Sequence, residues 1–107
     1  MSKYFKEIET NMNKNFLFVL DEAREFAGIP FIINSAYRSP THPLSIKNPT
    51  SSHIKGLAVD IKATDSTTRF KILEALLSVG FTRIGIANTF IHVDLDFDKT
   101  QDVIWTY

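Results

Sequence analysis

Two segments of this chain, residues 57–63 and 89–96, alternate apolar and polar side chains with the period of two that is typical of β-strands. Aspartate is poorly suited to strands, yet both segments carry it, as Asp60 in the first and as Asp94 and Asp96 in the second. In the second segment His92 shares a face with these aspartates, and the apolar face opposite would pack into a core. We therefore expect His92 and Asp94 to lie side by side and to meet Asp60. A local rule broken repeatedly beside a histidine is expected at a functional site.

A second histidine, His53, lies where a polar, proline-containing stretch meets the first of these strands. Gly56, just after it, permits a backbone conformation or a close approach that a side chain would resist. The histidines and aspartates of these segments are thus placed to hold one divalent metal. Two imidazoles and a carboxylate leave one zinc position open, as in hydrolytic sites, although the same ligands suit iron, cobalt or manganese. The alternative is a metal-free polar network, which would be indifferent to chelators.

Composition limits the other possibilities. A chain of 107 residues, 44% of them hydrophobic, can fill one core, so residues 1–107 are predicted to form a single domain. Twelve basic residues balance twelve acidic ones, which argues against a nucleic-acid partner. Cysteine is absent, so a metal would rest on histidine and carboxylates. No apolar run is long enough for a signal core or a membrane span, so we expect synthesis in the cytoplasm without a signal peptide and no membrane contact.

The periodicities along the chain predict an α+β fold with a small antiparallel sheet and two main helices. Helices are predicted over residues 4–27, ended by Gly28, and 67–79, capped by Asp65 or Ser66. Strands are predicted over residues 31–36, 57–63, 82–87 and 89–96, with a tight turn at Ala87 and Asn88 between the last two. The long loop 39–52 leads into His53 and is expected to wall a substrate cleft.

Four side chains allow two interpretations each. His42, in the long loop, could contact substrate or metal, but a solvent-exposed histidine is favoured. Asp96 is favoured as a solvated strand end. Trp105 and Tyr107 could stack on a sugar or a peptide, but large aromatic residues at the end of a small domain more often pack over its core, and that interpretation is preferred.

Three segments together resemble a known family. The stretch from Ser51 to Asp60 reads Ser-x-His-x-x-Gly-x-Ala-x-Asp, His92 lies on a later strand, and residues 35–39 read Ser-Ala-Tyr-Arg-Ser. This combination resembles the zinc D-Ala-D-Ala carboxypeptidase and L-alanyl-D-glutamate endopeptidase family, which shares its fold with the hedgehog signalling domain and includes bacteriophage endolysins. Ala36 replaces the family's usual glycine. The resemblance covers about residues 32–94.

The resemblance implies that His53, Asp60 and His92 bind one Zn²⁺ per chain. It also implies that Arg38 contacts the substrate or the developing oxyanion, a role that suits a guanidinium, and Ser51 and His42 are further candidates for substrate contact. Many members carry a glutamate before the last histidine as general base, and here that glutamate is absent. Asp94 is then the nearest carboxylate, and it serves either as the base or as a partner that orients His92.

The activity implied is zinc-dependent hydrolysis of an amide bond in the peptide stem of bacterial peptidoglycan, by a carboxypeptidase or an endolysin-type endopeptidase. A monomer is expected, and it would reach the cell wall only after release or with help across the membrane. The alternative is a zinc-stabilised, non-catalytic module that binds the cell wall or another protein, because the usual glutamate is absent.

Overall fold

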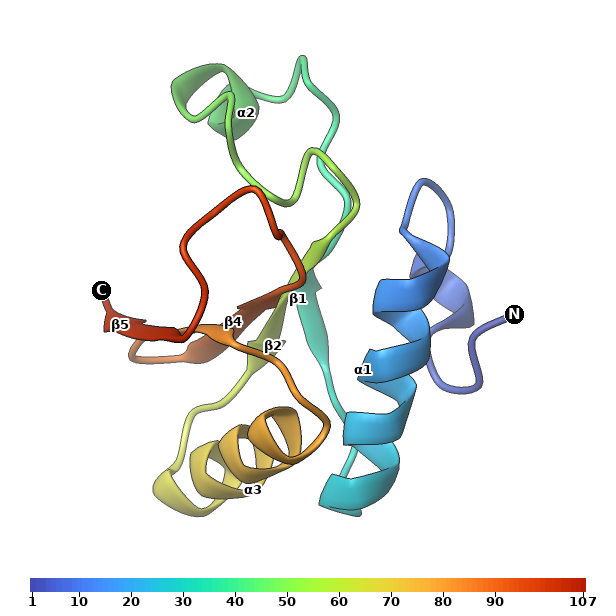
Figure 1. Cartoon of the computed structure of the whole chain (residues 1–107), viewed down its shortest axis with the longest axis vertical. Coiled ribbons are helices and arrows are strands. Elements are labelled where there is room, and N and C mark those ends of the chain that lie inside the picture. The colour runs from blue at the N-terminus through green and yellow to red at the C-terminus, as the bar shows by residue number, and fades with distance from the viewer.

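Five strands form one sheet in the order β1-β2-β4-β3-β5 (Figure 1). The computed structural model describes all residues, 1–107. The strands are β1 (Ile33–Ser35), β2 (Ala58–Lys62), β3 (Arg83–Ile86), β4 (Phe90–Asp94) and β5 (Val103–Thr106). All neighbouring pairs are antiparallel except β3 and β5, which are parallel. The predicted α+β fold with a small, mainly antiparallel sheet is therefore confirmed.

The helices begin and end at residues with clear local causes. They are the 3-10 helix η1 (Lys6–Ile8) and the α-helices α1 (Lys14–Ala27), α2 (Pro43–Lys47) and α3 (Ser66–Ser78). The Asn13 side chain accepts a hydrogen bond from the Phe16 amide at 3.0 Å and so caps α1, which ends at Gly28 in the left-handed conformation. Asp65 caps α3 in the same way through the Thr68 amide at 3.0 Å.

Three predicted elements differ from the structure. The single helix predicted over residues 4–27 is divided into η1 and α1, because Asn11 adopts a left-handed conformation and Asn13 forms a cap. The loop predicted over residues 39–52 contains the short helix α2, which begins at Pro43. Strand β5 was not predicted, although its Val-Ile-Trp-Thr sequence favours strands. The other predicted helix and strands are confirmed to within about two residues at each end.

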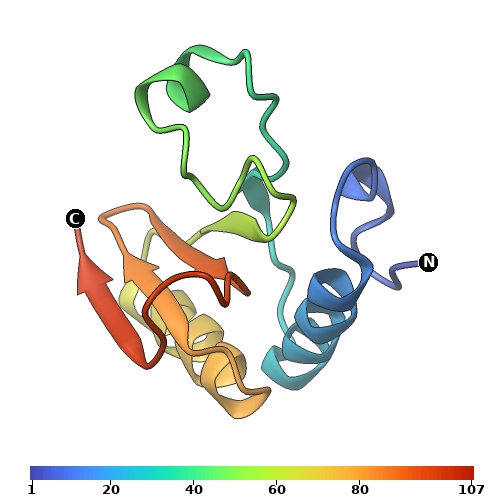
Figure 2. The ribbon, with the colours of Figure 1, turned by 45° about the horizontal axis from the view of Figure 1, so that its top comes forward.

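The two long helices cover one face of the sheet. In Figure 1, α3 lies below the sheet and α1 stands beside it, while the excursion that carries α2 lies at the opposite end of the molecule from α3; Figure 2 shows the same elements turned by 45°. Apolar residues of this face and of the helices form one core, including Phe16, Leu20, Ile61, Ile72, Leu76, Ile84, Ile91 and Val93. None of the helices has the length and apolar character needed to cross a membrane. The other face of the sheet, which we call the polar face, lies outside this core and carries Asp60 and His92.

Candidate metal centre

A row of paired residues crosses the polar face of the sheet. Ser35 pairs with Asp60, Asp60 with His92, His92 with Gly85, and Gly85 with Trp105. Residues paired across neighbouring strands point to the same side of a sheet. The register therefore brings Asp60 and His92 together from β2 and β4, as the alternation of the two segments predicts.

His53 reaches the same point from the turn before β2. Its Nε2 lies 3.3 Å from Asp60 Oδ1, and His92 Nδ1 lies 3.0 Å from the same oxygen. One donor atom from each of the three residues lies within 4.8 Å of the other two, so the group could hold one metal ion. Both imidazoles are buried, and Asp60 is partly exposed. The structure thus brings together the three residues that the resemblance implies as ligands.

Gly56 fixes the turn that carries His53. Its φ is +69°, and a Cβ added there would lie 2.2 Å from the backbone oxygen of Asn11. The Gly56 carbonyl oxygen accepts a hydrogen bond from the Asn13 amide at 2.9 Å. Only glycine fits both the conformation and the close approach. The special backbone predicted at this position is confirmed.

The outer nitrogen of each imidazole has an acceptor of its own. His53 Nδ1 lies 2.8 Å from the Ala36 carbonyl oxygen, and His92 Nε2 lies 2.8 Å from Asp94 Oδ2. When the protons are on these outer nitrogens, His53 Nε2 and His92 Nδ1 have lone pairs that can bind a metal beside Asp60. Metal-binding histidines usually have such partners, which fix the tautomer and the ring orientation. Two nitrogens and one carboxylate oxygen arranged in this way fit zinc with a position left open.

The charges of the group favour ionised carboxylates. Burial on its own would raise the pKa of Asp60, but hydrogen bonds and charge from His53 and His92 outweigh it and lower the pKa to about 2. Burial would lower the pKa of His92, and hydrogen bonds to Asp60 and Asp94 overcome it and raise the pKa. Asp60 is therefore available as an anionic ligand, while protons compete with a metal for His92.

Asp94 is held on both of its oxygens. Oδ2 accepts from His92, and Oδ1 accepts from Arg83 Nε at 2.8 Å and from the Asp96 amide at 3.2 Å. Its side chain is 1% exposed. Burial opposes ionisation of Asp94, but these contacts lower its pKa. Arg83 also donates from Nη1 to the Thr100 carbonyl oxygen at 2.6 Å, so it links Asp94 to the segment between β4 and β5.

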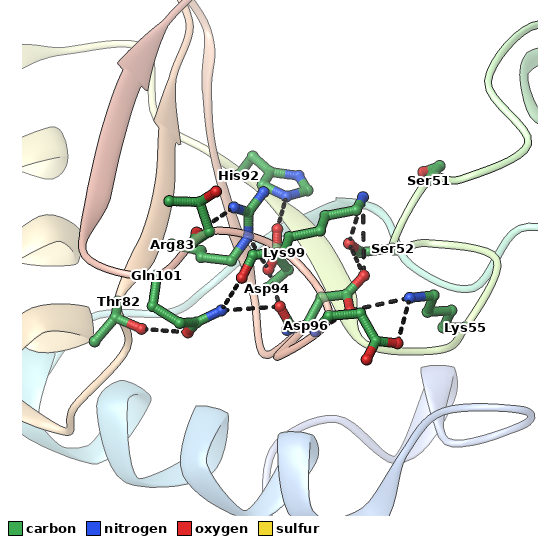
Figure 3. Close-up of polar contacts among 12 residues, drawn as sticks. Ser51, Ser52, Lys55, Thr82, Arg83, His92, Asp94, Asp96, Lys99 and Gln101 are labelled. Carbon is green, nitrogen blue, oxygen red and sulfur yellow. Dashed lines mark hydrogen bonds and ion pairs between the residues drawn. The ribbon is translucent and has the colours of Figure 1, made fainter.

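Asp96 is buried and joins two loops (Figure 3). Its Oδ2 accepts from the Ser52 hydroxyl at 2.7 Å, and its Oδ1 accepts from Lys55 Nζ at 3.0 Å. The prediction of a solvated strand end was wrong, because strand β4 ends at Asp94 and the chain then turns Asp96 inward against the His53 turn. Asp96 thus fixes the residue next to His53.

The metal group opens into a pocket of about 370 Å³. Arg38 and Ser51, two of the candidates for substrate contact, line it, and Asn48 brings in the end of the long loop. The Arg38 guanidinium has one hydrogen bond, from Nη2 to the Ser35 hydroxyl at 3.1 Å, and no carboxylate partner. His42 does not reach the pocket, because its Nδ1 caps α2 by accepting from the Leu44 amide.

The far wall of the pocket includes two aromatic residues for which the sequence analysis preferred a different position. Trp105 and Tyr107, expected to pack over the core, line the pocket together with Phe90. That expectation was wrong because β5 pairs with β3 and turns its odd-numbered residues to the polar face. Arg83 and Lys99 also line the pocket and were missed. The Val-Ile-Trp-Thr sequence of β5 favours a strand and could have indicated that Trp105 and Tyr107 share one face of the sheet.

The fold and the site define a class of protein. An α+β domain in which two histidines and an aspartate converge beside a pocket has the arrangement of a metal-dependent hydrolase. The sequence model of the family described as Peptidase M15 matches residues 3–94. The chain therefore belongs to the peptidase M15 family, and the resemblance to zinc D-Ala-D-Ala carboxypeptidases is confirmed. Comparison with curated proteins and with solved structures gave no significant match.

Proposed function

We propose that this protein is a zinc-dependent peptidase that hydrolyses an amide bond in the peptide stem of bacterial peptidoglycan. The observation that carries the proposal is the convergence of His53, Asp60 and His92 at the base of a pocket, within a chain of the peptidase M15 family. Zinc supplies, when bound, a Lewis acid that polarises an amide carbonyl and makes water nucleophilic at neutral pH.

The chain's own residues hold the metal and the substrate. His53, Asp60 and His92 are the proposed ligands, and the Ala36 carbonyl and Asp94 keep the two imidazoles in the tautomer that the metal needs. Arg38 is the proposed substrate residue, because its guanidinium lines the pocket with donors that no carboxylate occupies. Such a group can bind a substrate carboxylate or an oxygen that gains charge in the transition state.

We propose Asp94 as the residue that orients His92 and not as the general base. Its Oδ2 already accepts a hydrogen bond from the buried His92 and its Oδ1 one from the partly exposed Arg83, and its pKa is lowered. A base needs a free oxygen within hydrogen-bond reach of the water and a pKa close to the working pH. Asp94 has no oxygen without a hydrogen-bond donor, and its pKa is shifted away from neutral pH.

One observation favours a second candidate function. Asp60 and Asp94 are the only carboxylates that line the pocket, and the first is the proposed ligand. No further carboxylate is free there to accept a proton from water. A zinc-stabilised module that binds the cell wall or another protein without turnover is consistent with this set of residues.

The two candidates are separated by incubating the zinc-loaded protein with purified peptidoglycan, with and without a chelator, and identifying released fragments by mass spectrometry. Chelator-sensitive release of D-alanine indicates a carboxypeptidase, and release of a longer stem fragment indicates an endopeptidase. Intact peptidoglycan in the presence of protein with bound zinc refutes the peptidase and favours the binding module. An Arg38→Ala variant should bind zinc normally and lose activity.

A further inference from the structure

Three aromatic residues form one side of the pocket, and we call Phe90, Trp105 and Tyr107 the aromatic wall. The rings of Phe90 and Tyr107 meet edge to face with centroids 5.3 Å apart. The Trp105 ring lies 5.5 Å from the His92 ring, measured between centroids. The wall thus adjoins the candidate metal group directly.

The position of Trp105 depends on a glycine. Gly85 pairs with Trp105 in the sheet register, and a Cβ added to Gly85 would lie 2.6 Å from the indole ring. Because Gly85 has no side chain, the indole can lie over its backbone and lean toward His92, the next residue in the same row. The Arg83 guanidinium lies 5.1 Å from the indole centroid and supports it from the side.

The wall contributes little to the core. Tyr107 is 71% exposed, and Trp105 and Phe90 are partly exposed. None of the three belongs to the apolar core between the sheet and the helices. The family match ends at residue 94, so Trp105 and Tyr107 lie outside the matched region. An apolar surface of this kind, set in a pocket otherwise lined by polar groups, fits an apolar part of a ligand.

We propose that the aromatic wall binds the aliphatic side chain of the substrate residue next to the scissile amide and so selects which stem bond is cut. The inference rests on the proposed function. Trp105 is one ring away from His92, and a side chain in contact with it belongs to a residue that flanks the bond at the metal group. An alanine methyl group packs well on an aromatic face. A pocket that holds one methyl group discriminates against its absence by roughly 10-fold or more.

Binding can be measured by tryptophan fluorescence, a readout that does not depend on hydrolysis. Trp105 is the only tryptophan in the chain, so a change in emission reports on the aromatic wall. The probes are a synthetic stem pentapeptide ending in D-Ala-D-Ala and two analogues, one ending in Gly-Gly and one with its first L-alanine replaced by glycine. We expect the pentapeptide to change Trp105 emission and at least one analogue to bind roughly 10-fold more weakly. The inference is overturned when calorimetry detects no binding, when the pentapeptide binds with unchanged emission, or when neither analogue binds more weakly.

A variant series tests the same inference through specificity. Trp105→Ala should remove the preference for the alanine peptide over the affected glycine analogue, and Trp105→Phe should retain part of it. Ile104→Ala is the matched control, because Ile104 is the neighbouring residue on β5 and points away from the pocket. Preference is read as the ratio of the two dissociation constants, and thermal unfolding checks that each variant folds. An unchanged ratio in a folded Trp105→Ala protein overturns the inference.

The outcomes separate this inference from the proposed function. Emission changes and methyl preference without hydrolysis would leave the aromatic wall as a ligand site and refute the peptidase. Hydrolysis of peptidoglycan with no methyl preference would leave the peptidase and refute the wall as the selecting subsite. Emission changes caused by an N-acetylated disaccharide and not by the pentapeptide would assign the wall to a sugar, which contradicts the inference.

Discussion

Replacing Asp94 with asparagine tests whether this residue orients His92 or acts as a base. The change keeps the volume and removes the charge. Asparagine has one acceptor oxygen, whereas Asp94 accepts from His92 on one oxygen and from Arg83 on the other. One of these two donors must then face the amide NH₂ group. The Arg83 side chain is only 12% exposed, so water replaces the lost partner poorly.

The expected magnitude follows from these contacts. Removing one partner of a buried ion pair costs about 3–5 kcal/mol. We expect the lower end, about 3 kcal/mol, because Arg83 keeps its contacts with the Thr100 carbonyl and the Trp105 ring. For a domain of this size that corresponds to a fall in Tm of roughly 10–20 °C. Loss of the group that orients a metal-binding histidine typically weakens metal affinity by about 10- to 100-fold.

The assay is a zinc titration against a chromogenic chelator, together with thermal unfolding of the metal-free protein. Asp98→Asn is the matched control, because Asp98 undergoes the same chemical change but is 87% exposed and pairs only with Lys55 at the surface. Its stability should change by less than about 0.5 kcal/mol. An Asp94→Asn protein that binds zinc as tightly as the wild type and loses hydrolysis would show that Asp94 is the base, and the orienting role would be refuted.

Three further predictions concern backbone, loops and pH. Gly56→Ala should prevent folding or cost several kcal/mol by thermal unfolding, whereas Gly28→Ala, also at positive φ but with open space around it, should cost about 1 kcal/mol. Asp96→Asn leaves one acceptor oxygen for Ser52 and Lys55, and it should lower both the Tm and the zinc affinity measured by chelator competition, because Ser52 precedes His53. Folding raises the pKa of His92, so protonated His92 stabilises the metal-free protein. This contribution is complete at a pH below about 6.5, the pKa of His92 in the unfolded chain, and it is lost as the pH rises through the higher pKa of the folded protein. Asp60, with a pKa of about 2, contributes stability above about pH 4 that is lost as the pH falls toward 2. Zinc needs His92 with a free Nδ1, so the zinc-induced rise in Tm, measured at pH 5.5, 6.5 and 8, should increase with pH, and a rise that is largest at pH 5.5 would contradict this assignment.

Local sequence marked the residues of the metal group as functional, and the family resemblance supplied the set of three ligands. Alternation places His92 and Asp94 on one face of a strand, and the aspartates in otherwise apolar strands mark that face as functional. Gly56 indicates the close approach that holds the His53 turn. These signals need only the period of a strand and the steric demands of glycine. They do not depend on how distant segments are arranged.

The partners of the metal group could not be predicted, because they depend on register and on loop paths. Arg83 reaches Asp94 because the β3–β4 hairpin closes with the Ala87 amide bonded to the Phe90 carbonyl, so that Gly85 faces His92. A turn at Ala87 and Asn88, as predicted, shifts this register by two residues. Asp96 and Lys99 lie beyond the end of β4, where strand periodicity no longer indicates direction. The burial of Asp96 and the position of Lys99 beside it follow from the path of the chain to β5.

The two faces of the sheet explain how so small a domain holds several charges close together. The face toward α1 and α3 carries apolar side chains such as Val59, Ile84 and Ile91. Their burial stabilises the strands that carry Asp60 and His92. Because the strand period fixes both faces at once, a shift of register by one residue would expose that apolar face and also separate the metal group. The same interaction that stabilises the fold therefore fixes the geometry of the site. Core substitutions that lower the stability of the sheet should therefore weaken zinc binding in proportion to the stability lost, even though these residues lie on the opposite face from the metal group.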